Sequence, residues 1–305
     1  MNLLGALPAR FRRLRVLVVG CGDVGERVVR GLGSRVQWLA TTSSPERVPE
    51  LRRLGVRPVA ANLDHPQQLR RLSGVATHVI HLAPPSATRA DGARTDPRTA
   101  ALRRVFRRGT PPRQWVYVST TGVYGDCQGA WVDETRAVAP HNERAWRRVD
   151  AEYSVKNWGG AYTVLRAPGI YALNREGGTP AARLQRGTPV LQPSDDVYTN
   201  HIHADDLARA CIVALVGRGR RRVIQVTDDS DMTMGDYFDM AARVLGLPPP
   251  PRVTREEARA ELSPMQWSFM TESRRLSNQR MKQELGLRLR YPTAEQGLRT
   301  PTNLL

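Results

Sequence analysis

Three glycines lie close together directly after the first strongly apolar segment of the chain. Gly20, Gly22 and Gly25 form a GxGxxG pattern that follows the apolar run Leu14–Val19 and precedes the helical pattern Val24–Leu32. A strand, this pattern and a helix in succession are the setting in which the glycines bind a dinucleotide pyrophosphate. The first permits a tight turn, the second lets phosphate approach, and the third lets helix and strand pack closely. We therefore expect a dinucleotide-binding loop here.

The end of the second predicted strand carries hydroxyl groups instead of an acidic residue. Four hydroxyl side chains follow each other there: Thr41, Thr42, Ser43 and Ser44. Arg47 follows within one helical turn. An acid at this place binds the ribose of NAD, whereas an arginine accommodates the 2′-phosphate of NADP. We therefore expect NADP, with NAD as the alternative, since helix capping by Ser44 and a solvated Arg47 explain the same residues without a phosphate.

Short apolar segments alternate with helical patterns along the chain. Strands are predicted at Leu14–Val19, Arg35–Ala40, Val56–Val59, Thr77–Leu82, Gln114–Ser119, Tyr162–Arg166 and Arg222–Val226. Helices are predicted at Val24–Leu32, Pro45–Leu54, Pro97–Arg108, Asn142–Trp158, Thr179–Arg186, Asp205–Val216, Met232–Leu245, Arg255–Leu262 and Asn278–Leu285. This alternation is typical of an α/β protein with a Rossmann-type, doubly wound parallel sheet. We expect a dinucleotide-binding domain over residues 1–166 and a smaller C-terminal substrate lobe over 167–305, with 201–227 returning to the sheet.

The composition excludes several classes of protein. The chain has 305 residues and a formal net charge of +17, yet only Lys156 and Lys282 among its 46 basic residues are lysine. The arginines are spread along the sequence, which disfavours a nucleic-acid partner and indicates instead an electrostatic field that attracts anionic ligands.

Three scattered cysteines predict neither a disulfide scaffold nor a metal site. No apolar run approaches the roughly 18 residues of a membrane span. The arginines of the first 13 residues follow the apolar stretch, the reverse of a signal peptide. We expect a cytoplasmic protein.

Several segments resemble one known family. The segment Val118–Gly125, VSTTGVYG, is similar to the SSxxVYG segment of extended short-chain dehydrogenases/reductases, the NAD-dependent epimerase/dehydratase group. Four further segments resemble that family: His78–Ala83, Leu165–Tyr171, Asn200–Ala208 and Tyr291–Leu298. Together they span nearly the whole chain. The resemblance implies a Rossmann-type domain and a substrate lobe that meet at a cofactor cleft.

The resemblance also implies which residues touch the cofactor. The expected contacts lie in the glycine loop, after the second and third strands, and at the ends of the strands beside the nicotinamide. They are Gly20, Cys21, Gly22, Asp23, Val24, Gly25, Thr41, Thr42, Ser43, Arg47, Asn62, Leu63, Leu82, Ala83, Pro84 and Ser119. Thr120 aligns with the Ser/Thr of the family that polarises the substrate carbonyl, although a register one residue later would select Thr121.

The catalytic pair of that family, Tyr-x-x-x-Lys, occurs nowhere in this chain. Alignment on the helix after the VYG segment puts Arg144 at the tyrosine position and Arg148 at the lysine position. Arginine stays charged near neutral pH and therefore cannot exchange protons there. Tyr124 is a nearby hydroxyl that we consider as a replacement proton donor, with simple packing at the strand end as the alternative. These departures are similar to the atypical branch of the family, in which cofactor binding persists.

Two functional hypotheses follow. The first is an NAD(P)-dependent oxidoreductase or epimerase-like enzyme with Thr120 and Tyr124 as catalytic residues. The second is a catalytically silent sensor or scaffold that only binds NADP(H). The substrate is expected to be a small molecule, and Arg166, Arg175 and Arg183 would suit an anionic one or lie at the surface. The family often dimerises through helices of its Rossmann half, which leaves a homodimer open.

Overall fold

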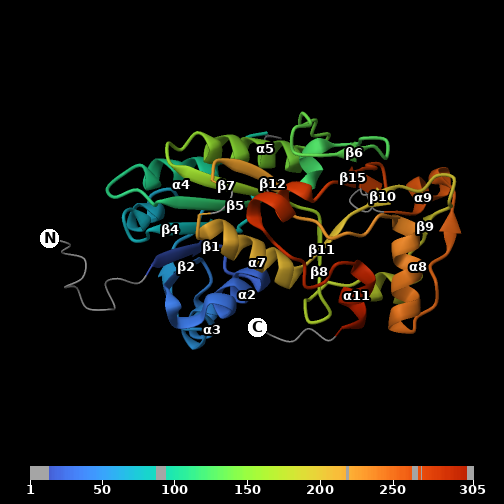
Figure 1. Cartoon of the computed structure of the whole chain (residues 1–305), viewed down its shortest axis with the longest axis horizontal. Coiled ribbons are helices and arrows are strands. Elements are labelled where there is room, and N and C mark those ends of the chain that lie inside the picture. The colour runs from blue at the N-terminus through green and yellow to red at the C-terminus, as the bar shows by residue number, and fades with distance from the viewer. Residues whose placement is uncertain (1–13, 87–93, 218–219, 263–266, 269, 301–305) are drawn as a thin grey trace.

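The computed structural model describes residues 14–86, 94–217, 220–262, 267–268 and 270–300, and its centre is a seven-stranded sheet (Figure 1). The strands run in the spatial order β12-β7-β5-β4-β1-β2-β3, and every neighbouring pair is parallel. Their bounds are β1 Arg15–Val19, β2 Gln37–Thr42, β3 Val56–Ala60, β4 His78–His81, β5 Gln114–Thr120, β7 Ala161–Ala167 and β12 Arg222–Gln225. Strand order reverses at β1, as in dinucleotide-binding folds, so the predicted Rossmann-type doubly wound sheet is confirmed.

Helices cover both faces of this sheet. One face carries α2 (Asp23–Leu32), α3 (Val48–Arg53) and α7 (Ala204–Leu215), and the other carries α4 (Pro97–Phe106) and α5 (Glu143–Lys156). Side chains of β1 alternate between the two layers, because successive residues of a strand point to opposite faces. Val16 and Val18 therefore pack with α2 and α7, whereas Leu17 and Val19 pack with α4 and α5.

The C-terminal lobe lies beside one end of the sheet and has a separate apolar core (Figure 1). Its helices are α6 (Ala181–Gln185), α8 (Met234–Leu245), α9 (Arg255–Glu261) and α11 (Ala294–Arg299). Its short strands are β8 (Gly169–Tyr171), β9 (Val190–Leu191), β10 (Tyr198–Thr199), β11 (His201–His203), β13 (Met232–Thr233) and β14 (Arg252–Val253). The pair β6 (Trp131–Val132) and β15 (Arg275–Leu276) joins the lobe to a segment of the first half. Between these pieces the chain returns to the main sheet as α7 and β12.

Several predicted helices differ from the structure, and the one predicted at Asn278–Leu285 is a π-helix confined to Met281–Leu285. The predicted helix Pro45–Leu54 is a 3₁₀ turn at Pro45–Arg47 followed by α3, and the side chain of Ser44 makes no capping hydrogen bond. Ser44 instead bonds through its backbone to the Thr42 hydroxyl, which donates to the Ser44 carbonyl at 3.1 Å. The predicted helix Met232–Leu245 begins two residues later, because Thr233 caps α8 in a box with Asp236 after β13.

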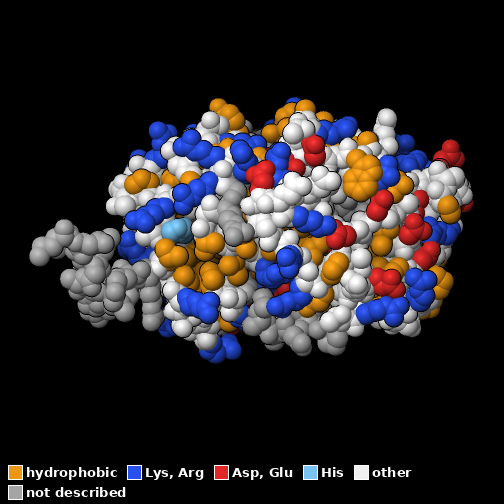
Figure 2. All heavy atoms as spheres, viewed as in Figure 1, with side chains coloured by type: hydrophobic (Ala, Val, Ile, Leu, Met, Phe, Trp, Pro, Cys, Tyr) orange, Lys and Arg blue, Asp and Glu red, His pale blue; other side chains and the backbone are white. Residues whose placement is uncertain are grey.

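Charge is distributed unevenly over the surface. On the face shown in Figure 2, Lys and Arg side chains are spread over both halves of the molecule, whereas Asp and Glu gather over the C-terminal half. Residues 1–13, which we expected not to form a signal peptide, lie outside the described residues. Within the described ranges, no helix combines the length and apolarity that crossing a membrane requires.

A buried ion pair joins helix α5 to the end of strand β7. The Arg166 guanidinium donates to both carboxylate oxygens of Glu152, at 2.9 and 2.7 Å, and the two side chains are only 4% and 2% exposed. Burial by itself would raise the pKa of Glu152, but the hydrogen bonds and charge of Arg166 outweigh it and lower that pKa. The pair therefore keeps both groups ionised inside the protein.

We expect the substitution Glu152→Ala to lower the free energy of unfolding by about 3 to 5 kcal/mol, because it leaves the Arg166 cation buried without its partner. Urea unfolding followed by circular dichroism measures the change. Glu176→Ala, at an exposed position, is the control and should change the free energy by less than about 0.5 kcal/mol. A loss for Glu152→Ala as small as that of the control would contradict this account of the pair.

Candidate functional site

The three glycines of the loop after β1 adopt the geometry that dinucleotide binding requires. Gly20 has a φ of +84°, and a Cβ there would lie 2.6 Å from the Ala83 nitrogen. A Cβ at Gly25 would press against Val18 and Leu82 at 3.3 Å, whereas one at Gly22 would meet nothing within 4 Å. The first and third glycines thus allow a tight turn and close packing, and the second leaves open space at the N-terminus of α2. Such a helix N-terminus, with its unpaired N–H groups, binds phosphate.

The end of β4 closes onto this loop. The backbone nitrogens of Leu82 and Ala83 both donate to the Val19 carbonyl, at 2.8 and 3.0 Å. Leu82, Ala83 and the exposed Pro84 therefore lie beside the glycine loop, as expected for cofactor contacts. Ser119 lies at the end of β5 at the same carboxyl edge of the sheet, with only 4% of its surface exposed.

The hydroxyl residues after β2 have different roles. The Thr41 side chain is buried, and its hydroxyl accepts a long hydrogen bond of 3.4 Å from the Gly20 nitrogen, which helps to hold the glycine loop in place. The hydroxyl of Thr42 is occupied by Ser44, and Ser43 is exposed. Asn62 follows β3, where its side chain accepts from the Asp64 nitrogen at 2.9 Å, and Leu63 is half-buried beside it.

Arg47 is fastened beside the glycine loop. Its Nη2 donates to the Cys21 carbonyl at 3.1 Å and to Glu26 at 2.8 Å, and its Nη1 contacts Glu50. The Glu26 carboxylate raises the pKa of Arg47 further above its usual value. About 35% of the Arg47 side chain remains exposed, so the guanidinium faces solvent next to the loop.

Cys21 and Asp23 of the loop are held by their surroundings. Burial raises the pKa of the Cys21 thiol to about 12, so it is not a reactive thiolate. Asp23 forms ion pairs with Arg27 at 3.0 Å and with Arg175 of the lobe at 2.6 Å. Burial would raise the pKa of Asp23, but the hydrogen bonds from these two arginines lower it. Arg27 also donates to Asp205 at the start of α7. One ionic cluster therefore joins α2 to α7 and to Arg175 of the lobe.

A cavity of about 570 Å³ lies between the carboxyl edge of the sheet and the C-terminal lobe. Thr120 and Thr121 line it at the end of β5, and Arg144 and Arg148 line it from α5. The Thr120 hydroxyl accepts from the Gly122 nitrogen at 3.2 Å, which leaves its own proton for another acceptor. The lobe supplies the opposite wall with Tyr171, Arg183, His201, Tyr237, Phe238, Glu272 and Arg274 among others.

Tyr124 is not part of the cavity lining. The 3₁₀ turn Thr121–Tyr124 directs its side chain into a small apolar cluster, where it is 1% exposed and lies under the Arg166 guanidinium, 4.8 Å from its ring centre. Burial raises the pKa of its hydroxyl. Thr120 therefore lines the cavity, whereas Tyr124 is buried outside its lining. This position agrees with the alternative that Tyr124 is a packing residue at the strand end.

Arg144 and Arg148, which we expected at the positions of the catalytic pair, both line the cavity. Arg148 donates through Nη1 to the Tyr117 hydroxyl at 3.1 Å and to the Val118 carbonyl at 3.0 Å. This double hydrogen bond fixes one side of its guanidinium to β5. Arg144 lines the same wall one helical turn earlier.

The arginines that we expected at the pocket divide into two groups. Arg166 pairs with Glu152 and Arg175 pairs with Asp23, so both charges are neutralised outside the cavity lining. Arg183 lines the cavity. Arg274 and Tyr237 also line the cavity, but the sequence did not predict them there. They come from segments far apart in the chain that carry no recognisable pattern.

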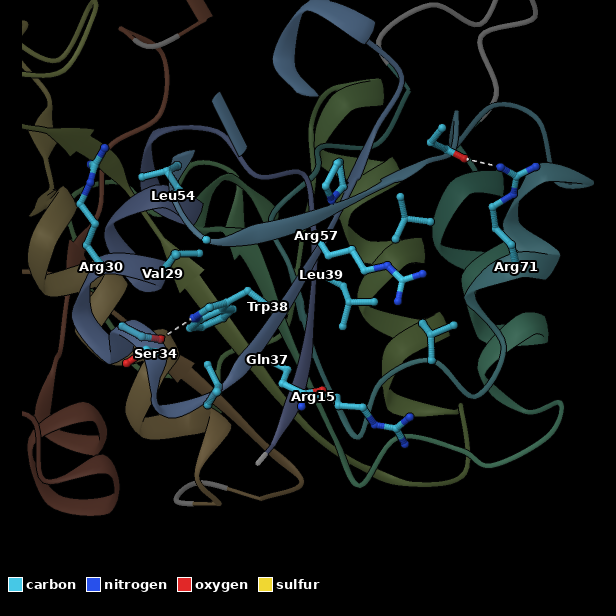
Figure 3. A pocket seen from close by; sticks show the side chains of 17 residues that line it. Arg15, Val29, Arg30, Ser34, Gln37, Trp38, Leu39, Leu54, Arg57 and Arg71 are labelled. Atoms are coloured by element: carbon cyan, nitrogen blue, oxygen red, sulfur yellow. Dashed lines mark hydrogen bonds between the residues drawn. The ribbon is translucent and has the colours of Figure 1, made fainter. Parts of the chain in front are cut away.

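A second cavity, of about 1080 Å³, extends from the amino ends of β1 and β2 along β3 to Ala60 (Figure 3). Arg15, Gln37, Trp38 and Arg57 line it, and the Trp38 indole donates to the Gly33 carbonyl at 2.8 Å. No residue of the glycine loop lines this cavity, so it is not the expected cofactor site. Among the described residues, no group of three or more His, Cys, Asp or Glu side chains could hold a metal ion.

The fold and the glycine loop define a nucleotide-binding α/β protein, and the comparisons with known proteins define its family. The model of the NAD dependent epimerase/dehydratase family matches residues 16–226. That match covers more than half of the chain, which therefore belongs to this family. No curated protein matches the sequence.

Solved structures agree with this assignment. A functionally unknown conserved protein from Silicibacter pomeroyi has 31% identity and a TM-score of 0.77, with 93% of this chain and 96% of that chain covered. UDP-glucose 4-epimerase from Thermotoga maritima has 18% identity and a TM-score of 0.75, with 94% and 96% covered. UDP-glucuronic acid 4-epimerase from Bacillus cereus, solved with NAD, has 14% identity and a TM-score of 0.72, with 94% and 97% covered. At these identities the two epimerases show a shared fold.

We expect the substitution Gly22→Ala to weaken dinucleotide binding at least tenfold without unfolding the protein, because the added methyl group fills space that only a ligand would occupy. Calorimetric titration with NADPH and thermal unfolding measure the two effects. Gly20→Ala is the comparison variant: it should lower the melting temperature, since its methyl group meets the Ala83 backbone. Unchanged affinity in Gly22→Ala would contradict phosphate binding at this loop.

Proposed function

We propose that this protein is an NADP(H)-dependent oxidoreductase or epimerase-like enzyme that acts on a small molecule. The observation that carries the proposal is the position of Thr120 in a cavity at the same carboxyl edge of the sheet as the glycine loop. When bound, the nicotinamide supplies or accepts the hydride. The substrate would occupy the cavity between β5 and the lobe.

The residues of the chain have separate tasks in this reaction. Thr120 accepts from the Gly122 nitrogen, so its hydroxyl proton points the other way and polarises the substrate oxygen. Arg144 and Arg148 remain charged and stabilise negative charge that develops on that oxygen. Fixed cations therefore replace the proton-exchanging pair of the family by electrostatic stabilisation. The proton that the reaction needs is supplied by the substrate itself or by solvent.

The cofactor is proposed to be NADP. Arg47 lies beside the loop with about a third of its side chain exposed, and no acid ends β2. Glu26 and Glu50 offset part of the Arg47 charge, so a 2′-phosphate must compete with two carboxylates for this guanidinium. We therefore infer a modest preference for NADP over NAD.

The relatives suggest the scale of the substrate. The Thermotoga maritima epimerase is described with UDP-glucose, and the Bacillus cereus enzyme is named for UDP-glucuronic acid. A cavity of about 570 Å³ falls within the usual range for small-molecule sites. We infer a small-molecule substrate, a functional boundary near residues 166–167, and a cytoplasmic location. A homodimer through helices of the Rossmann half stays a prediction.

A silent NADP(H)-binding sensor or scaffold is the second candidate function. It is favoured by Arg144 and Arg148, which stand where the family has its proton-exchanging pair. Dinucleotide binding without oxidation of NADPH by any carbonyl compound in a broad screen would select this candidate. Steady turnover that a cavity substitution abolishes would reject it.

We expect Arg47→Ala to weaken NADPH binding about tenfold, roughly 1.4 kcal/mol, and to leave NADH binding unchanged, because only NADPH carries the 2′-phosphate. Calorimetric titration with both dinucleotides measures the change. Arg52→Ala, an exposed arginine on α3, is the control for loss of one positive charge. Equal affinities of the native protein for the two dinucleotides would overturn the preference.

We expect Thr120→Ala to lower kcat/KM for a carbonyl substrate about 100-fold, the effect of losing one hydrogen-bond donor to a developing oxyanion. The affinity for NADPH should stay within about twofold, since an interaction with the substrate oxygen is lost and none with phosphate. Thr135→Ala, whose hydroxyl bonds to Asp133 at the surface, is the control. Unchanged turnover would remove Thr120 from the mechanism.

A further inference from the structure

One wall of the cavity carries a cation that no described acid balances. Arg183 projects from α6 into the cavity lining, and its guanidinium carbon lies 4.4 Å from the centre of the Phe238 ring. Its Nε and Nη2 atoms are buried and have no hydrogen-bond partner. Two buried donors without acceptors are a considerable cost, since buried polar groups are almost always satisfied.

The other arginines of the cavity differ from Arg183. Arg274 forms an ion pair with Glu272 at 2.8 Å and donates to the Gly125 carbonyl at 2.7 Å. Arg148 is held by the Tyr117 hydroxyl and the Val118 carbonyl. Arg183 has no hydrogen bond or ion pair within the described part of the chain. Arg183 is half-buried, and the described residues offer no acceptor for its two buried nitrogens.

The surroundings of Arg183 offer no compensating charge. Burial lowers the pKa of the guanidinium, and the nearby Arg186 adds to this effect. Burial also lowers the pKa of His201 to about 3, so its ring is neutral. The His201 ring stacks on the Tyr237 ring, with 3.8 Å between the two ring centres. Tyr237 and Phe238 thus give this end of the cavity an aromatic wall around an isolated cation. An isolated charge in such a site is stabilised most by an anion brought in by a ligand.

We propose that Arg183 binds an anionic group of the substrate, a carboxylate or a phosphate, at the lobe wall of the cavity. The word substrate rests on the proposed function, but the anion site itself does not. The planar guanidinium matches two oxygens of a carboxylate or phosphate at once. Phe238 supports the plane of the guanidinium by stacking, which fixes the direction of the two donors.

This assignment orients the substrate. Its anionic group lies at Arg183, and its reacting carbon lies at Thr120 on the opposite wall. Arg183 is then a specificity-determining residue, because an analogue without the anionic group leaves its buried donors unpaired. Sites that depend on such hydrogen bonds reject the neutral analogue strongly.

Thermal unfolding of the full chain without dinucleotide tests the anion site directly. Melting temperatures are compared in chloride, inorganic phosphate and succinate at equal pH and ionic strength, for the native protein, Arg183→Met and Arg186→Met. Methionine keeps an apolar stem against Phe238, and Arg186 is an exposed arginine three residues away that does not line the cavity. The Arg186→Met control corrects for the general stabilisation that phosphate gives to any protein.

We expect phosphate or succinate to raise the melting temperature of the native protein and of Arg186→Met more than that of Arg183→Met. In chloride, Arg183→Met should melt about 2 °C higher than the native protein, because it lacks the unpaired buried charge. A response to phosphate alone indicates a phosphorylated substrate, and a response to succinate alone indicates a carboxylate. Arg183→Gln, which keeps donors but no charge, replaces Arg183→Met if that variant fails to fold.

The same anion response in native protein and Arg183→Met would overturn the proposal, as would the absence of any response in the native protein. The measurement needs no cofactor. A protein that binds neither NADPH nor NADH but shows the Arg183-dependent response contradicts the proposed function and supports the anion site. The reverse result contradicts the anion site alone.

Discussion

The contact between the glycine loop and the end of β4 determines the geometry of the site. The Val19 carbonyl accepts the backbone N–H groups of Leu82 and Ala83, which directly follow β4, and Gly20 approaches Ala83 so closely that no side chain fits. This contact directs the first turn of α2 toward the open carboxyl edge of the sheet. The backbone N–H groups at the start of α2 and the cavity wall at the end of β5 therefore lie at the same edge of the sheet.

Electrostatics of the cleft depend on which arginines are already paired. The buried arginines of the described residues meet acids: Arg166 pairs with Glu152, Arg27 pairs with Asp23 and Asp205, and Arg147 pairs with Glu143. Such pairs neutralise charge and hold segments together, although their net contribution to stability is small. Of the arginines that line the cavity, Arg183 is the one with no hydrogen bond or ion pair within the described residues. A net charge of +17 therefore says less about binding than the few guanidinium groups left to face the cleft.

Most of the fold could be predicted from the sequence, because its signals are local. Each of the seven sheet strands is a short apolar run, and the glycine pattern specifies its own turn. The site was predictable only in part. Tyr124 belongs to the segment Val118–Gly125 that resembles the family, yet the 3₁₀ turn places its ring in a buried apolar cluster. Arg166 is neutralised by Glu152, which comes from another element. Pairings of this kind depend on three-dimensional packing, which spacing along the chain does not encode.

The return of the chain to the sheet has a consequence for synthesis. Helix α7 covers the face of the sheet that contains Val16 and Val18, and it ends at Leu215, well after the lobe has begun. Strand β12 completes the sheet edge only at Gln225. While the ribosome is still making the first part of the lobe, the N-terminal half therefore exposes the part of this apolar face that α2 and α3 do not cover. At a synthesis rate of about 5–20 residues per second, that face waits several seconds for its helix, a period in which a chaperone or a neighbouring nascent chain can bind it.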